Sequence, residues 1–163
     1  MQKPQPKRAI WVVCATLAAL LVGGTARMGV QLKPYWIAKY HGYNSDLHGA
    51  MLSGAPLADA DLRFADLQRA TLTGANLRRA DLLLSKLEHA RLGGANLEGA
   101  RLSGATLYGA DLRGADLVGA HLLGYQVFDI VEPSANLAGA QYDTRTRWPG
   151  GFHPAQHGAI LVK

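Results

Sequence analysis

Histidines and carboxylates are the side chains of this 163-residue chain that could carry acid–base or metal chemistry. His153 and His157 are four residues apart, a spacing that brings two zinc ligands to one side only in a helix. Pro154 follows the first of them, and no cysteine or acidic residue lies close in the sequence. We therefore expect no zinc site here. The remaining histidines are expected in outward or flanking positions: His41, His48, His89 and His121.

No catalytic motif accompanies these side chains. The sequence holds no glycine-rich phosphate loop, no helical metal signature and no Gly-x-Ser-x-Gly elbow. The single cysteine, Cys14, excludes an internal disulfide, and in its apolar surroundings it is expected to act as a small hydrophobe. The sequence therefore predicts a protein that is not an enzyme and that needs no metal or cofactor.

The net charge of +5 is unevenly distributed along the chain. Residues 1–45 contain six Lys or Arg and no acidic residue, whereas residues 46–142 contain eight basic and eleven acidic residues. Residues 143–163 contain three basic residues and one acidic residue. The basic character thus belongs to the two ends. The middle of the chain, with a net charge of −3, does not indicate nucleic-acid binding.

The elements that position these side chains follow from a five-residue repeat. Every fifth residue from Leu47 to Leu122 is leucine, and the residue two places earlier is alanine from Ala50 to Ala120, except for Ser85. A five-residue step rotates by about 140° along an α-helix and changes faces along a flat strand, so neither element gathers the leucines. A short extended segment that turns a corner after each unit does gather them. A quarter turn per unit predicts a square coil of about 20 residues, stacked by strand-type hydrogen bonds.

These consecutive units of the form Ala-(Asp/Asn)-Leu-x-x resemble the pentapeptide-repeat family. The resemblance implies an all-β solenoid, a right-handed quadrilateral β-helix with leucine at the centre of each unit. Residues 46–142 are expected to form about five such coils and a rod about 24 Å long. An interior filled by Leu and Ala leaves no cavity for a substrate, which again disfavours an enzyme.

The repeat pattern weakens towards its C-terminal end. Over residues 125–134, Tyr125 stands in an alanine position and Pro133 cannot donate a backbone hydrogen bond, so we expect a bulged or looped coil there. Residues 143–163 are similar to a closing segment that is common after such repeats. Within it, the ring of Trp148 is large enough to plug the last coil.

The N-terminal segment, residues 1–27, is expected to determine the location of the protein. Basic residues precede an uncharged stretch, residues 9–26, which is long enough for one membrane-spanning helix. The same stretch also fits a signal peptide that is cleaved near Ala26. We favour a retained single-pass anchor, with the rod outside the cytoplasm, over export after cleavage.

The reason for this preference lies in residues 28–45, a capping helix or juxtamembrane linker. Tyr35, Trp36 and Tyr40, interspersed with lysines, resemble an interfacial aromatic and basic collar. A short amphipathic helix that caps the first coil is an alternative interpretation of the same residues, and both can hold.

Residues twenty apart are expected to stack on the outside of the coil, which allows the surface to be predicted. One polar ladder would contain Asn76, Asn96, Asp116 and Asn136, and another would contain Asp61, Asp81, Arg101 and His121. Outward apolar residues stand out against this polar background and form a candidate partner patch. One set is Phe64, Leu83 and Leu84, and a second set is Tyr108, Leu123 and Phe128.

Two functions remain open. The first is a non-catalytic, membrane-associated or exported rigid scaffold that binds a protein partner, unidentified from the sequence, or a second copy of itself. The second comes from the resemblance, because some pentapeptide-repeat proteins mimic DNA in the cytoplasm and bind type II topoisomerase. The repeat segment carries a net charge of −3, whereas the same length of duplex DNA carries about 14 negative charges. We therefore favour the scaffold.

Overall fold

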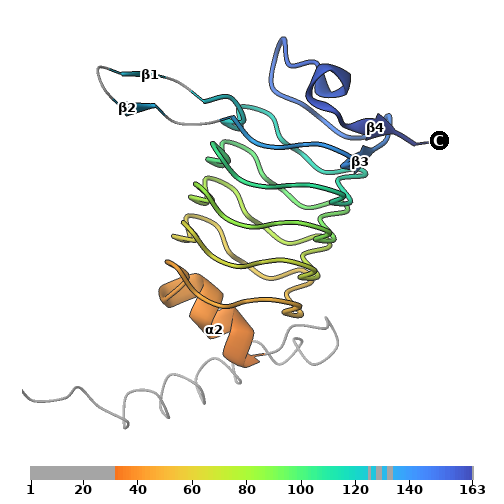
Figure 1. Ribbon diagram of the computed structural model, residues 1–163. Helices are drawn as coiled ribbons and strands as arrows, with labels where there is room; N and C mark the ends of the chain where they lie inside the picture. Colours follow the sequence, from red (N-terminus) through yellow and green to blue (C-terminus); the bar gives the residue numbers. More distant parts are fainter. Residues whose placement is uncertain (1–31, 125, 128–129, 132–133, 163) are drawn as a thin grey trace, which may run out of the picture.

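The computed structural model describes residues 32–162 apart from 125, 128–129 and 132–133. The described chain begins with helix α2 (Leu32–Tyr40) and continues as a stack of square coils (Figure 1). Strands β1 (Gln126–Val127) and β2 (Ile130–Val131) form an antiparallel hairpin beside the stack. The chain ends with β3 (Gln141–Tyr142), the 3-10 helix η2 (Pro154–His157) and β4 (Ile160–Leu161).

Each five-residue unit consists of one residue bridged to the next coil, the leucine, a two-residue turn and the alanine. The turn closes when the alanine N–H donates to the leucine carbonyl three residues earlier, as from Ala55 to Leu52 at 3.1 Å. The second turn residue has a positive φ, which is 66° at Gly54. A turn of this kind favours glycine at that position, because glycine adopts the left-handed region without a steric penalty. The repeat therefore turns one corner of the square every five residues.

Successive coils are joined by parallel backbone hydrogen bonds. The N–H of Leu52 donates to the carbonyl of Thr71 at 2.8 Å, and the N–H of Thr71 donates to the carbonyl of Ala50 at 2.8 Å. Residues twenty apart consequently bridge up to residue 121. The ladder predicted from the sequence is confirmed for Asp61, Asp81, Arg101 and His121.

The interior of the stack is filled by the leucines and alanines of the repeat. Ser85, which replaces an alanine, is also fully buried, and its hydroxyl donates to the Leu82 carbonyl at 2.8 Å. No polar group of this residue is therefore left unpaired in the core. The buried repeat leucines are Leu47, Leu52, Leu57, Leu62, Leu67, Leu72, Leu77, Leu82, Leu87, Leu92, Leu97, Leu102, Leu107, Leu112, Leu117, Leu122 and Leu137.

A ten-residue insertion interrupts the last coils. The N–H of Ala135 donates to the carbonyl of Leu122 at 2.7 Å, the same bond that closes the other corners, so residues 125–134 leave the coil at a corner. The hydroxyl of Ser134 accepts from the N–H of Gly124 at 3.0 Å at the base of this insertion. The β1–β2 hairpin lies within it and projects sideways from the rod (Figure 1).

The insertion changes which residues stack. Beyond residue 121 the bridges pair Thr106 with Asn136 and Asp116 with Arg147. The prediction that Asn136 continues the ladder of Asn76, Asn96 and Asp116 is therefore wrong. Asn136 lies on a different face because the ten inserted residues add half a coil to the sequence but nothing to the stack.

Helix α2 covers the N-terminal end of the stack (Figure 1). Ala38 is buried, and Tyr35 and Ile37 pack against the core. The helix runs directly into the first coil at Gly42, where a Cβ atom would lie 2.5 Å from the carbonyl oxygen of Asp61. Only glycine fits this junction without displacing backbone.

The predicted anchor or signal helix, residues 9–26, lies outside the described residues. Among the residues that the structure does describe, no helix combines the length and the apolar character that crossing a bilayer requires.

The closing segment covers the opposite end of the stack. Trp148 packs against the core and stacks on Phe152 at 5.3 Å between ring centroids, and β4 adds to β3 as a parallel strand. Asp143 fixes the start of this segment, since its carboxylate accepts from the N–H of Gly114 at 2.9 Å and from the Arg145 guanidinium at 2.7 Å. The hydrogen bond from Arg145, together with the backbone N–H donors, lowers the pKa of Asp143 to about 2.

The opposite orientations of neighbouring residues in the coil give a direct test of the fold. Leu92 is fully buried and Arg91 is exposed on the adjacent bridge position. Leu92→Asp should prevent folding because it buries an unpaired charge, whereas Arg91→Asp should change the free energy of unfolding by less than about 1 kcal/mol. Thermal unfolding followed by circular dichroism measures both effects. Equal melting temperatures for the two variants would contradict the inward and outward assignment.

The low pKa of Asp143 predicts how acid weakens the closing segment. A folded pKa of about 2, below the ordinary value of 3.8, means that the carboxylate stabilises the fold at pH values above 4. This contribution is lost as the pH falls from about 4 to about 2. Asp143→Asn should therefore lower the melting temperature at pH 7, and the two proteins should converge near pH 2. A constant difference between them across this range would show that ionisation of Asp143 does not stabilise the segment.

Candidate functional site

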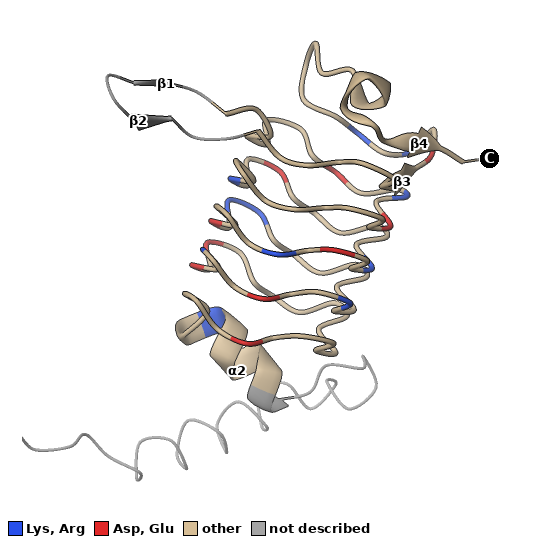
Figure 2. Ribbon diagram, viewed as in Figure 1, with Lys and Arg blue, Asp and Glu red and all other residues tan. Residues whose placement is uncertain are grey.

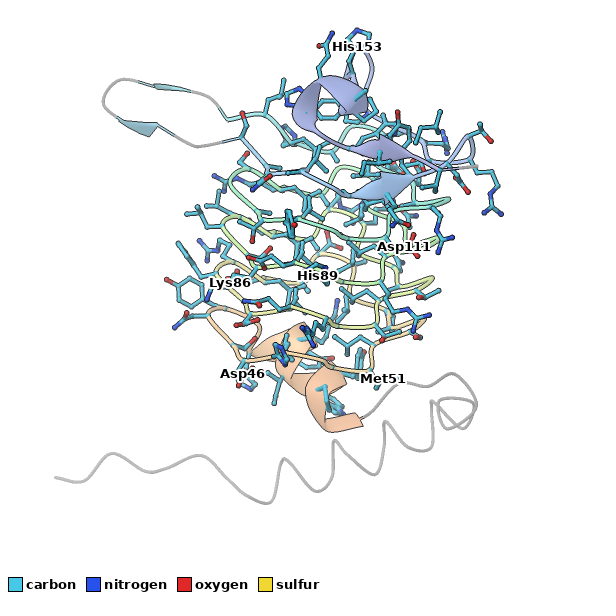
Figure 3. All side chains as sticks on the ribbon, turned by 45° about the vertical axis from the view of Figure 1, so that its right-hand side comes forward. Asp46, Met51, Lys86, His89, Asp111 and His153 are labelled. Atoms are coloured by element: carbon cyan, nitrogen blue, oxygen red, sulfur yellow. The ribbon has the colours of Figure 1, made fainter. Side chains whose placement is uncertain are left out.

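The outside of the coil consists of four faces and four corners, and the faces are polar. Figure 3 shows Asp46 and Lys86 on one face, Met51 and Asp111 on the next, and His89 at the corner between them. Bridged residues form the columns of each face, so a side chain on one coil lies above its counterpart on the coil before. Neighbouring side chains in one column therefore lie about 4.8 Å apart, and each column has its own chemical character.

Ion pairs neutralise most of the acidic residues on these columns. Arg63 pairs with Asp61 at 2.7 Å, and Arg113 pairs with Asp111 at 2.6 Å. In both pairs the hydrogen bond from the guanidinium lowers the pKa of the carboxyl, so both acids are ionised at neutral pH. Figure 2 shows basic and acidic positions interspersed along the coil. The surface therefore offers no extended field of a single sign.

One corner of the rod is apolar instead. We call it the apolar corner, and it consists of Tyr43, Phe64, Leu83, Leu84 and Leu123. The exposed fraction of the residue is 55% for Tyr43, 41% for Phe64, 38% for Leu84 and 52% for Leu123. Leu83 is half-buried beside Leu84.

Contacts along the corner make these residues one continuous column in the first three coils. The rings of Tyr43 and Phe64 meet edge to face at 5.6 Å, and the Phe64 N–H donates to the Leu83 carbonyl at 3.0 Å. The Arg63 guanidinium lies 5.2 Å from the centre of the Tyr43 ring, a cation–π distance. In the fourth coil, buried Ser103 takes the place of a large side chain and donates to the Leu123 carbonyl at 3.4 Å.

The backbone of the apolar corner is strained. Phe64 and Leu84 occupy the second turn position with φ values of 60° and 55°. A non-glycine residue in this left-handed region costs about 1–2 kcal/mol. Polar residues such as Arg69 and His89 occupy the same position at the next corner, so the strain alone is not distinctive. Phe64 and Leu84 differ from these residues because they combine a left-handed φ with an exposed apolar side chain. Neither feature stabilises the fold, so the combination points to a role in binding.

The structure divides the predicted partner patch differently from the sequence analysis. Phe64, Leu83 and Leu84 lie together as predicted, but Leu123 belongs to their corner and not to that of Tyr108. Tyr108 lies at the next corner, where its ring meets that of His89 at 5.4 Å. Phe128 was predicted to stack on Tyr108; on the next coil the carbonyl that accepts from the N–H of Gly109 is that of Ala138. The side chain of Phe128 lies outside the described residues.

Tyr43 was missed because it precedes the leucine repeat. It lies twenty residues before Arg63, and the N–H of its neighbour Asn44 donates to the Arg63 carbonyl at 2.8 Å. Extending the twenty-residue register backwards from Phe64 would have placed it on the same corner.

The described residues show no chemistry beyond these contacts. Within residues 32–162, apart from 125, 128–129 and 132–133, no three His, Cys, Asp or Glu side chains are close enough together to hold a metal ion. A shallow cleft of about 420 Å³ lies between the last coil and the closing segment, where it is lined by His121, His153 and His157 but by no carboxylate. His157 stacks on Phe152 at 4.6 Å, and the cleft contains no carboxylate to orient an imidazole.

Comparison with known proteins places the repeat in a family. Copies of the pentapeptide repeats model match residues 45–82, 55–90 and 85–122. The protein alr5209 from Nostoc PCC 7120, a pentapeptide repeat protein, is 30% identical over 83% of this chain and 98% of its own length, with a TM-score of 0.45. The chain belongs to the pentapeptide-repeat family.

A second solved structure agrees with this assignment. The pentapeptide repeat protein Rfr23 from the cyanobacterium Cyanothece 51142 is 41% identical, with a TM-score of 0.56, over 63% of each chain. This pentapeptide-repeat protein thus spans about 63% of the length of that relative. No curated protein matches it significantly. The family has the right-handed quadrilateral β-helix, and proteins of this family are generally non-catalytic, so no enzyme family is indicated.

The strain at the apolar corner predicts an unusual response to glycine. Leu84→Gly removes a partly buried side chain but relieves a left-handed φ, so the free energy of unfolding should change by less than about 1 kcal/mol. The neighbouring Leu83→Gly has no such relief and should destabilise the fold by about 2 kcal/mol. Chemical denaturation of both variants measures the contrast. Equal losses of stability would show that Leu84 is not strained.

Proposed function

We propose that this pentapeptide-repeat protein is a non-catalytic rigid scaffold, held at a membrane, that binds a protein partner through its apolar corner. The observation that carries the proposal is the column of exposed apolar side chains on a rod whose other columns are mostly polar or glycine. Contiguous exposed apolar residues on a soluble surface indicate an interaction site.

The energetics of interfaces support the choice of this corner. Desolvated aromatic side chains dominate binding hot spots, at about 2 kcal/mol or more each, whereas paired surface charges contribute little. Tyr43 and Phe64 already contact each other at 5.6 Å, so they present a preformed aromatic surface. The coil beneath them is held by backbone hydrogen bonds, and a partner therefore binds without ordering a loop.

The alternative, a cytoplasmic mimic of DNA that binds type II topoisomerase, has less support. Such mimicry requires a regular array of unpaired negative charges. Asp59, Asp61 and Asp111 each accept hydrogen bonds from an arginine instead. Arg101 interrupts the column of Asp61 and Asp81, and Lys86 interrupts the column of Asp46 and Asp66. The surface charge therefore favours a protein partner that covers apolar residues.

The membrane part of the proposal rests on the sequence of residues 9–26, an uncharged stretch preceded by Lys3, Lys7 and Arg8. It is the length of one membrane-spanning helix, and the family fold itself needs no such segment. Export after cleavage near Ala26 would leave the apolar corner intact, so the binding proposal holds for either location.

A pair of glycine substitutions tests the binding surface without disturbing the backbone. Phe64→Gly with Leu84→Gly removes the apolar side chains while keeping residues that suit a positive φ. Affinity capture from a native membrane extract should lose the partner with this variant. Sedimentation of the purified protein shows in parallel whether the corner also mediates self-association.

The matched control is Arg69→Gly with His89→Gly, which makes the same backbone change at the neighbouring corner, where φ is 58° and 57°. This control should retain the partner. If both double variants fold and recover the same proteins as the unmodified chain, the apolar corner is not the binding surface.

A further inference from the structure

The position at which the chain enters the rod limits how far the rod can lie from a membrane. Helix α2 begins at Leu32 and lies at the N-terminal end of the stack (Figure 1). Only residues 27–31 separate it from the end of the predicted anchor at Ala26. A fully extended chain rises by at most about 3.6 Å per residue, so this linker spans about 20 Å at most. If residues 9–26 are in the bilayer, the N-terminal end of the rod must lie within about 20 Å of its surface.

The side chains at this end are those that favour the lipid headgroup region. Tyr35 and Ile37 pack against the core, and Trp36 is half-buried with its indole N–H turned away from solvent. The ring of Trp36 stacks on that of Tyr40 at 4.7 Å between centroids. Tyr40 is 58% exposed, and Tyr43 follows it at the foot of the apolar corner. Tryptophan and tyrosine are enriched at membrane interfaces because their rings are apolar and their N–H and O–H groups are polar.

The basic composition of residues 1–45 also fits an anionic surface, and it outweighs the three acidic residues of the first coil, Asp46, Asp59 and Asp61. No acidic residue occurs before Asp46, and residues 1–45 contain six Lys or Arg. Basic residues near the leaflet gain about 1 kcal/mol each from anionic lipids. The ammonium group of Lys39 donates to the carbonyl of Ala58, which links α2 to the corner formed by Ala58 and Asp59. The positive charge of Lys39 therefore stays at the N-terminal end of the rod.

We propose that the N-terminal end of the rod, formed by α2 and Tyr43, rests on the headgroup layer of an anionic bilayer and holds the coil axis upright. The inference rests on the proposed attachment through residues 9–26. In this orientation the apolar corner runs away from the membrane. Tyr43 lies at the lipid surface, and Leu123, four coils further along, lies about 19 Å above it.

The three tryptophans allow a direct test with the full-length protein. Trp36 is at the end proposed to touch lipid, Trp148 is in the closing segment at the opposite end, and Trp11 is in the predicted anchor. Two variants isolate the two ends: Trp11→Phe with Trp148→Phe leaves Trp36, and Trp11→Phe with Trp36→Phe leaves Trp148. Each is reconstituted in vesicles of phosphatidylcholine and phosphatidylglycerol, mixed three to one, with or without a nitroxide on the lipid headgroup.

Flotation of the vesicles first measures attachment, and fluorescence then measures orientation. The nitroxide should quench at least about half of the Trp36 emission and almost none of the Trp148 emission. Equal quenching of both tryptophans in floated protein would mean that the rod lies flat, and no quenching of either would mean that it stands clear of the surface. Either result overturns the upright orientation while leaving attachment intact. Protein that fails to float would overturn the attachment itself, and the orientation with it.

Discussion

The corner turn is the constraint on which the whole structure depends. Each five-residue unit uses its alanine and leucine to fill the interior, and it closes with one hydrogen bond, such as that from Ala55 to Leu52 at 3.1 Å. Three positions per unit remain for the surface. One is the bridge residue, whose backbone is fixed by both neighbouring coils, and the other two are the turn residues. Because the interior is solid, function is restricted to the side chains at these three positions of each unit.

The two kinds of surface position have different physical roles. Bridge residues stand on a hydrogen-bonded ladder, where short polar side chains such as that of Asn76 accept from a backbone N–H two residues later, here that of Arg78 at 3.2 Å. Turn residues project at the corners, and the second of them needs a positive φ that glycine meets at the lowest cost. A Phe or a Leu at this position therefore strains the backbone of the turn and also exposes apolar surface to water. Phe64 and Leu84 carry both costs on adjacent coils, which is why the apolar corner is a stronger indication of function than an exposed leucine on a flat face.

The five-residue period was sufficient to predict the interior but not the stacking order. Every repeat leucine and alanine that the period placed inside is buried, because a corner after each unit is the only way to bring them together. The period repeats every five residues, however, whereas a coil contains twenty. An insertion of ten residues keeps the phase of leucine and alanine, so the pattern resumes at Ala135 and Leu137 as if half a coil had been added. The sequence therefore located the irregular segment at 125–134 but could not show that it leaves the coil at a corner. The grouping of Leu123 with Tyr108 has a different cause, because Leu123 precedes the insertion and the twenty-residue register already places it after Leu83 and Ser103, at another corner than Tyr108.

The insertion places the β1–β2 hairpin at the corner that carries the apolar side chains. Because residues 125–134 leave the coil after Leu123 and Gly124, the β1–β2 hairpin projects from the same corner that carries the apolar column (Figure 1). The coils between Tyr43 and Leu123 are joined by backbone hydrogen bonds at every bridge, so the distance between the foot of the corner and the base of the insertion at Gly124 is fixed. A flexible linker between the same two points would allow a partner to adapt its position. A stack of coils does not, so a partner that covered Phe64 and Leu84, as proposed, would be held at one height on the rod. In the proposed function the repeat is a spacer of defined length, and the corner turns determine both that length and the side offered to a partner.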